Sequence, residues 1–239
     1  MIDGAIEIGW HGVRLVMLPD RCVWLPDAGS VLVADMHLGK PASFRAMGVP
    51  VPEAVTGRDL HRISALLGIT GAKRLIVLGD LIHDAAALQQ RTLDAVRAWR
   101  GSLGSIEINL VVGNHDRRAR TCEPLGVRAL GDRAVVGGVV LTHEPPRIDQ
   151  EPTLCGHIHP VVSVGDGPRR VRSACFWFGG MTGILPAFGS FTGGQLVACE
   201  GAAVFAAGER SVVPVTRAAG ALCVGDSDGI AAETAYDRL

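Results

Sequence analysis

Two different spacings of apolar residues divide the first half of the chain into helices and short strands. Apolar residues at every third or fourth position predict helices over 53–68 and 85–100. Short apolar runs, bounded by turns rich in proline, aspartate and glycine, predict strands. These runs are 13–18, 22–25, 31–34, 74–78 and 106–112. Because strands and helices alternate here, we expect parallel pairing through right-handed crossovers.

Beyond about residue 126 the pattern becomes all-β. Gly137-Gly138 separates two short apolar runs, which is typical of a two-residue hairpin turn. Residues 165–167 separate two further runs in the same way. The paired runs are 134–136 with 139–141, and 161–164 with 170–175. This half of the chain therefore predicts antiparallel hairpins.

The two halves together indicate one domain of the α/β class. Parallel strands with helices followed by antiparallel strands favour two sheets packed face to face, with helices outside. We assign this domain to residues 1–216. The Ala- and Gly-rich stretch 217–239 carries scattered charge, so we expect a flexible C-terminal tail.

Composition narrows the function classes. The 239 residues are 48% hydrophobic and 20% charged, with a net charge of −1, which excludes a disordered chain. The same balance gives no bulk attraction to nucleic acid or to a membrane surface, so any nucleic-acid contact must come from local patches. The N-terminus does not resemble a signal peptide, and no apolar run reaches membrane-spanning length. The six cysteines form no CxxC pair, so we expect reduced thiols in a cytoplasmic protein.

Metal-binding residue types follow five of the apolar runs. The motifs are Asp35-Met36-His37, Gly79-Asp80-Leu81-Ile82-His83-Asp84, Gly113-Asn114-His115-Asp116, Thr142-His143-Glu144 and Gly156-His157-Ile158-His159. Ligands of open α/β sheets bind outside the carboxyl ends of the strands, so these motifs are expected to meet on one rim. Turn-favouring residues that merely cap strands would explain the glycines, but not six of the eight histidines.

The donor types favour a two-metal site. Carboxylate, amide and imidazole donors without thiolate suit Mn²⁺, Fe²⁺ or Zn²⁺. Seven donors exceed one tetrahedral site. Two ions about 3.5–4 Å apart could hold a hydroxide between them for in-line attack on phosphorus. In both D-x-H and H-x-H, the spacing lets two side chains point one way if the chain is extended.

The ordered motifs DxH, GDxxH, GNHD, H and GHxH resemble the calcineurin-like metallophosphoesterase superfamily, and they cover residues 31–160. The form GDLIH, with His83, resembles the double-strand-break repair nucleases of that superfamily more than its protein phosphatases. Residues 31–52 and 184–194 resemble the PdeM group, small phosphoesterases called ligase-associated DNA damage response endonucleases. The resemblance implies a calcineurin-like αββα sandwich of two mixed sheets.

The resemblance also implies two overlapping sets of metal ligands. The first ion would be held by Asp35, His37, Asp80 and His159. The second would be held by Asp80, Asn114, His143 and His157. Asp80 would therefore bridge the two ions. Mn²⁺ is the first choice of metal, with Fe²⁺ or Zn²⁺ as alternatives.

Three further residues receive catalytic roles from the resemblance. His115 would contact the phosphate or protonate the leaving oxygen, and Asp116 would orient its other ring nitrogen. His83 would face the scissile phosphate. The chain is too short for the capping and coiled-coil parts of the large repair nucleases, so DNA handling by such parts is not expected.

These observations predict a di-metal phosphoesterase that hydrolyses phosphodiester bonds, with a DNA nuclease in DNA repair as the leading function. The family's name implies a link to a DNA ligase and a helicase. The sequence does not determine the oligomeric state, and a dimer is possible. A phosphatase or phosphodiesterase for nucleotides or other small phosphate esters is the alternative, which the near-zero net charge keeps open. A non-catalytic binding module would explain the fold but not the complete donor set.

Three basic stretches are candidate nucleic-acid contacts. Lys40 and Arg45 follow the metal-binding motif that ends at His37. The motif that ends at Asp116 is followed by Arg117, Arg118 and Arg120. Such groups could clamp phosphates or simply form a solvated surface. Arginines at 169–172 precede the aromatic residues 176–178, which would suit single-strand binding if exposed and the core if buried.

Overall fold

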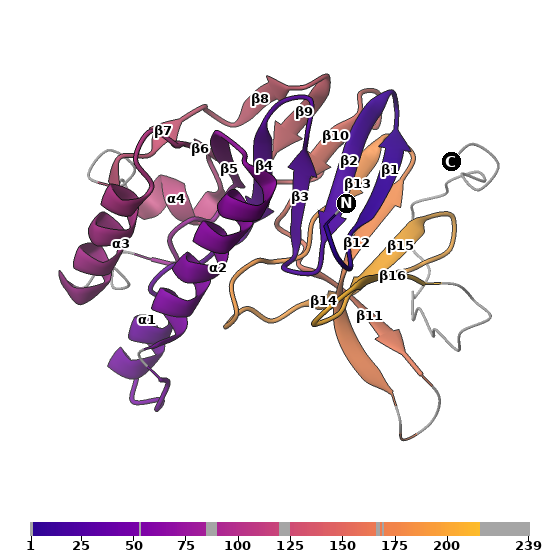
Figure 1. The fold of residues 1–239 in the computed structure, drawn as a ribbon. Helices are drawn as coiled ribbons and strands as arrows, with labels where there is room; N and C mark the ends of the chain where they lie inside the picture. Colours follow the sequence, from indigo (N-terminus) through magenta and orange to yellow (C-terminus); the bar gives the residue numbers. More distant parts are fainter. Residues whose placement is uncertain are drawn as a thin grey trace.

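The computed structural model describes residues 2–52, 54–84, 90–119, 125–165, 168 and 170–215. Within these ranges, two β-sheets pack face to face, and the helices lie on the outer side of one of them (Figure 1). The expected α/β sandwich of two mixed sheets is confirmed. Among the described residues, however, no helix covers the outer face of the second sheet (Figure 1), so the second helical layer of the expected αββα arrangement is absent from the described part of the chain. The expected tail, 217–239, lies outside the described residues.

The first sheet has seven strands in chain order over the described residues. They are β1 Ile6–Trp10, β2 Val13–Leu18, β3 Cys22–Leu25, β4 Ser30–Ala34, β5 Arg74–Leu78, β6 Glu107–Val111 and β7 Arg128–Ala129. β1 to β4 pair antiparallel, whereas β4 to β7 pair parallel through helical connections. The carboxyl ends of β4, β5 and β6 consequently lie at one edge of the sheet.

Both faces of this sheet are buried, which explains its unbroken apolar runs. In β4, Val31 and Val33 pack with the helices, whereas Leu32 and Ala34 pack against the second sheet. Successive side chains of a strand point to opposite faces, so a strand covered on both sides must be apolar throughout. The strands β4 and β5 therefore end where the apolar run gives way to a polar residue or a glycine.

The second sheet has nine strands in the described part of the chain. They are β8 Arg133–Val136, β9 Val139–Thr142, β10 Thr153–Cys155, β11 Pro160–Val164, β12 Val171–Gly179, β13 Thr182–Ile184, β14 Gln195–Leu196, β15 Ala203–Ala207 and β16 Val212–Pro214. The hairpins β8–β9 and β11–β12 form as predicted. β10 differs from the antiparallel expectation, because it runs parallel to both of its neighbours, β9 and β13. The motifs after β9 and β10 therefore reach the same edge.

Four described helices accompany the first sheet. They are α1 Lys40–Ala46, α2 Ala54–Thr70, α3 Gln90–Ser102 and α4 Asn114–Ala119. α2 and α3 cover the sheet's outer face (Figure 1) and are joined by Trp99 Nε1, which donates to Ser64 Oγ over 3.0 Å. The predicted helix 85–100 is α3, and its first residues, 85–89, lie outside the described residues. α1 and α4 were not expected.

The cysteines only partly follow the expectation of reduced thiols. Cys22, Cys155 and Cys175 are free and buried, and burial raises the pKa of each thiol. Cys199 is disulfide-bonded and departs from the expectation. No helix among the described residues is long and apolar enough to cross a membrane.

Candidate metal centre

Backbone hydrogen bonds beyond the ends of β4 and β5 bring the first two motifs together. Asp35 N donates to Gly79 O over 3.2 Å, and His37 N donates to Asp80 O over 2.8 Å. A bridge between Leu38 and Ile82 continues the same pairing. The parallel register of the two strands therefore extends into the loops and places Asp35 and His37 opposite Asp80.

Five of the residues at this edge have a left-handed backbone. Their φ angles are 52° for Asp35, 46° for His37, 52° for Asp80, 68° for His157 and 51° for His159. The D-x-H and H-x-H segments are therefore not extended, which was the condition for their side chains to point one way. In D-x-H, Asp35 and His37 nevertheless reach one donor cluster, whereas in H-x-H the His157 ring faces His143 and the His159 ring faces Asp35. The left-handed conformation is unfavourable for residues other than glycine and occurs often at functional sites.

The ligands expected for the first ion surround one point. His159 Nε2 lies 3.2 Å from Asp35 Oδ1, and His37 Nε2 lies 3.8 Å from Asp80 Oδ2. One donor atom from each of Asp35, His37 and His159 falls within 4.8 Å of the others. The side chains of Asp35, His37 and Asp80 are each at most 4% exposed. These donors are thus gathered in a site shielded from water.

The ligands expected for the second ion meet at His143. Its Nδ1 lies 3.0 Å from the carbonyl of Leu78, a contact in which Nδ1–H donates and Nε2 keeps its lone pair. Nε2 lies 2.9 Å from Asn114 Oδ1, 3.1 Å from His157 Nδ1 and 3.5 Å from Asp80 Oδ1. Asp80 therefore has one carboxylate oxygen on each side, as a bridging ligand requires.

Two buried atoms of the first set lack a hydrogen-bond partner. They are Asp35 Oδ1 and His37 Nε2. A buried polar atom without a partner costs free energy, so their common orientation toward one point needs a compensating ligand. Burial, the nearby Lys40 charge and the neighbouring histidines lower the pKa of His37 to about 2, which keeps its imidazole neutral. A carboxylate oxygen and a neutral imidazole are the donors that a divalent cation takes, so these residues fit a metal.

Glycines after three strands leave the space that the donors occupy. A Cβ at Gly79 would lie 2.0 Å from His143 Nδ1, and Gly79 has a φ of +76°. A Cβ at Gly113 would lie 2.4 Å from Asp80 Oδ1, and one at Gly156 would lie 2.6 Å from Asp35 Oδ2. Each of these glycines therefore leaves room for a ligand side chain.

His83 and His115 lie on the more open side of the centre. Their side chains are 19% and 31% exposed, against 4% for His37. Their rings stack, with centroids 5.3 Å apart, and His115 Nε2 lies 3.9 Å from Asp80 Oδ2. His83 Nδ1 lies 3.4 Å from His37 Nδ1. Both rings are placed where an approaching phosphate could reach them together with the metal ligands.

Asp116 does not have the orienting role expected for it. The Nδ1 atom of His115 contacts the backbone carbonyl of His83, so Asp116 does not hold that nitrogen. The Asp116 carboxylate instead accepts from Gly113 N over 3.0 Å and from Ile82 N over 3.3 Å. It therefore ties the loops after β5 and β6 together. Burial raises the pKa of this carboxyl, although the two backbone hydrogen bonds oppose the shift.

Most of the basic and aromatic residues considered as nucleic-acid contacts have other roles. Arg117 pairs with Asp132 over 2.9 Å, and Arg45 Nη1 donates to Val51 O. Phe176 and Phe178 are buried between the sheets, so the sequence 176–178 is not an exposed aromatic surface. Arg118 carries no described side chain, and Arg120 and Arg169 lie outside the described residues.

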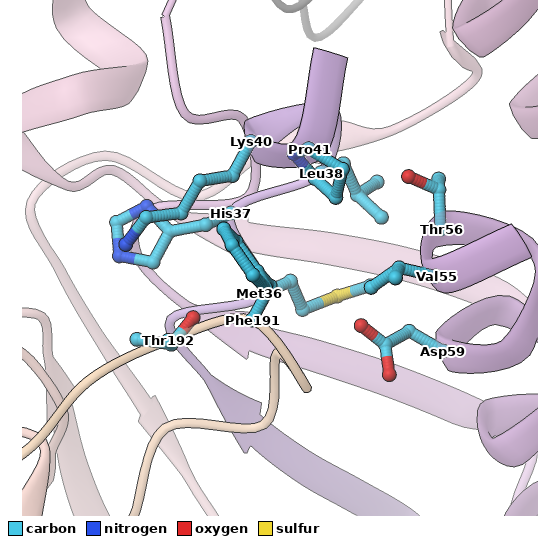
Figure 2. A pocket seen from close by; sticks show the side chains of 10 residues that line it. All are labelled: Met36, His37, Leu38, Lys40, Pro41, Val55, Thr56, Asp59, Phe191 and Thr192. Atoms are coloured by element: carbon cyan, nitrogen blue, oxygen red, sulfur yellow. The ribbon is translucent and has the colours of Figure 1, made fainter. Parts of the chain in front are cut away.

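A small pocket adjoins His37 on the side of α1 and α2. Figure 2 shows Lys40 reaching it from α1 and Phe191 and Thr192 from the loop after β13. Phe191 was not singled out from the sequence, although it lies within 184–194, one of the segments that carry the resemblance. Thr192 Oγ1 is buried there without a hydrogen-bond partner.

The same loop is fixed to α2 by a buried polar network. Asp59 Oδ2 accepts from Ser190 N over 3.0 Å, and Arg62 Nη1 donates to Asp59 Oδ1 and to Phe188 O over 3.0 Å each. The Arg62 guanidinium also lies 4.2 Å from the centre of the Phe188 ring. The position of Phe191 relative to the metal centre is therefore set by α2.

One comparison with a solved structure agrees with this geometry. Pseudomonas putida nuclease MPE has 33% sequence identity, and the alignment covers 88% of this chain and 100% of that one with a TM-score of 0.76. The E. coli phosphoesterase YfcE aligns at 15% identity and a TM-score of 0.42, over 78% of this chain and 97% of that one. The sequence matches no family model and no curated protein. Identity at this level over the whole length of nuclease MPE, together with the clustered donors, shows that the chain belongs to the calcineurin-like metallophosphoesterases.

Proposed function

We propose that this hydrolase is a nuclease that cleaves phosphodiester bonds in DNA. The observation that carries the proposal is the convergence of seven donors from five strand ends in a fold shared with nuclease MPE at 33% identity. Nucleic acid is the substrate named for that relative. DNA, rather than a small phosphate ester, is therefore the first substrate to test.

Two divalent ions would be held by the two donor sets that share Asp80, and we propose Mn²⁺ at both positions. Carboxylate, amide and imidazole donors suit Mn²⁺ and would also accept Fe²⁺ or Zn²⁺. When bound, such ions activate a water molecule and neutralise charge on the phosphate. Every other contribution comes from the residues of this chain.

His115 and His83 would act on the phosphate from the open side of the centre. The carbonyl of His83 fixes His115 Nδ1, so Nε2 is the ring atom left to contact the phosphate or protonate the leaving oxygen. The stacked His83 ring restricts the orientation of His115 and presents a second imidazole beside it. Asp116 contributes indirectly, because it holds the loop on which His115 lies.

The cellular setting belongs to the same proposal. We infer a cytoplasmic DNA-repair role and a functional link to a DNA ligase and a helicase, on the resemblance to the PdeM group. A dimer remains a candidate assembly. Co-purification of the tagged protein with a ligase or helicase, and its molar mass in solution, would test these inferences.

The decisive experiment is cleavage of end-labelled single- and double-stranded DNA with Mn²⁺, beside a phosphomonoester and a simple phosphodiester. Chelated enzyme and the Asp80→Asn variant are the controls, since loss of the shared carboxylate weakens both ion sites. We expect DNA cleavage that disappears in both controls. Hydrolysis of the small esters with intact DNA would replace the nuclease by a phosphatase or phosphodiesterase for small substrates.

A further inference from the structure

Lys40 places a partly buried positive charge beside the metal centre, with no described carboxylate at ion-pairing distance. A turn closed by Lys40 N donating to His37 O, over 3.1 Å, brings the side chain back toward His37. The charge lowers the pKa values of both His37 and His83, although burial is the larger cause in each. Among the described residues, no ion pair within 4.0 Å joins Lys40 to an acidic side chain. Burial lowers the pKa of Lys40, and the Asp35 and Asp80 carboxylates oppose this shift from farther away. A half-buried ammonium group without a partner favours the arrival of an anion.

Phe191 presents an aromatic ring next to the same charge. It lines one pocket with His37 and Lys40 (Figure 2), and the residue remains 36% exposed. An edge-to-face contact with Phe44, with centroids 5.2 Å apart, restricts the ring's orientation. The pocket beneath has room for about one water molecule, so a nucleobase could not enter it. A base would have to lie on the exposed part of the ring.

We propose that Lys40 and Phe191 form a nucleotide-binding subsite beside the metal centre. The Lys40 ammonium contacts a phosphate oxygen of the bound strand, and Phe191 stacks on an unpaired base next to that phosphate. The inference rests on the proposed nuclease function, because it assigns the substrate contacts of that site. Base stacking on an aromatic side chain needs no particular base, so the subsite binds nucleotides without reading sequence.

The other candidate contacts do not provide this combination in the described part of the chain. Arg45 and Arg117 are engaged with Val51 and Asp132. Trp177 is half-buried, and its Nε1 donates to Ala198 O on the outer face of the second sheet. Lys40 and Phe191, by contrast, lie in contact with one pocket that also includes a metal ligand, His37.

The stacking contact is tested by comparing the wild type and Phe191 variants on substrates with and without a base. The kcat/KM for cleavage of a single-stranded thymidine oligonucleotide is compared with that for an abasic oligonucleotide with the same phosphates. Phe191→Leu is expected to lower kcat/KM on the thymidine substrate at least about five-fold, whereas Phe191→Tyr keeps most of it. On the abasic substrate, wild type and Phe191→Leu should be equal, because the stacking partner is already absent.

The salt dependence of binding tests the phosphate contact. Lys40→Gln should lower the slope of log K against log salt by about 0.7 for single-stranded DNA, as expected when one phosphate contact is lost. Lys73→Gln is the matched control, because Lys73 is an exposed lysine at the opposite end of β5 and should leave the slope unchanged. Fluorescence anisotropy of the chelated protein gives the slope without cleavage.

The outcomes separate the two proposals. Two results would overturn the subsite alone, provided that the wild-type protein cleaves the oligonucleotide. One is an equal loss of kcat/KM on both substrates in Phe191→Leu. The other is an unchanged salt dependence of binding in Lys40→Gln. A wild-type protein that hydrolyses a small diester but neither binds nor cleaves the oligonucleotide overturns the nuclease function and the subsite with it. Both proposals are supported if Phe191→Leu loses kcat/KM only on the thymidine substrate and Lys40→Gln reduces the slope of log K against log salt.

Discussion

Individual side chains in the metal centre divide into buried donors and more exposed histidines. His115 belongs to the second group, since its side chain is 31% exposed and its Nδ1 is fixed by a backbone carbonyl. We expect His115→Ala to keep its metal content but to slow the chemical step by roughly 10²–10⁴. Elemental analysis and single-turnover kinetics check both statements. His61→Ala, at an exposed histidine on α2, is the control, and loss of metal from His115→Ala would contradict the assigned role.

The buried donor His37 makes the metal-free protein sensitive to acid. Its folded-state pKa of about 2 lies below the ordinary value near 6.5, so below about pH 6.5 the unfolded chain takes up a proton that the folded protein does not. Stability from this residue is therefore lost as pH falls, by about 2 kcal/mol at pH 5. Urea unfolding of chelated protein at pH 7 and pH 5 measures the loss. In His37→Gln the difference should shrink, and an unchanged difference would refute the assignment.

At the scale of single elements, the ends of the strands depend on glycines that admit the donor side chains. Gly79→Ala would add a Cβ 2.0 Å from His143 Nδ1 and would also strain the backbone. Displacement of His143 should abolish binding of one ion, which calorimetric titration with Mn²⁺ would detect.

The control variant Gly71→Ala separates the backbone strain caused by Gly79→Ala from its steric clash with His143. Gly71 has a φ of +64°, but nothing lies within 4 Å of an added Cβ. The control variant should therefore lose about 1–2 kcal/mol of stability from backbone strain alone and still bind both ions. Equal metal affinities in the two variants would show that His143 is not displaced.

At the scale of the whole molecule, the metal centre joins loops from both sheets, so its occupancy should stabilise the entire fold. A single ion at 100 times its dissociation constant adds about 2.7 kcal/mol, which corresponds to roughly 5–10 °C in Tm for a protein of this size. Differential scanning calorimetry with Mn²⁺ measures the shift, and Asp80→Asn should largely abolish it. No shift in the wild type would favour a non-catalytic binding module on the same fold.

Much of this architecture was predictable because burial on two faces makes a strand apolar throughout. The limits of β2, β3 and β5 coincide with the predicted runs. The convergence of the motifs followed from parallel strands that end at one edge. The short helices α1 and α4 were not predicted, since α1 has no long apolar period and α4 begins inside the motif Asn114-His115-Asp116, where no apolar period indicates a helix.

Features that depend on contacts between distant segments could not be predicted from local pattern. Asp116 bonds to Ile82 and Gly113 rather than to the histidine beside it, and only the packing of the loops decides between these partners. The left-handed backbone of the donors is likewise not fixed by residue type, since aspartate and histidine adopt it more often than most residues but still only in a minority of cases. Phe191 lies beside His37 because α2 holds its loop there, and no local pattern in the sequence indicates that contact.

The left-handed conformations of Asp35, His37, Asp80, His157 and His159 imply a trade-off between activity and robustness. Each costs of order 1–3 kcal/mol that the rest of the fold must outweigh. Glycine at any one of these positions would relieve the backbone strain but would also remove a donor atom from the metal centre. Such a variant should therefore be more stable than the wild type without metal and should bind metal more weakly.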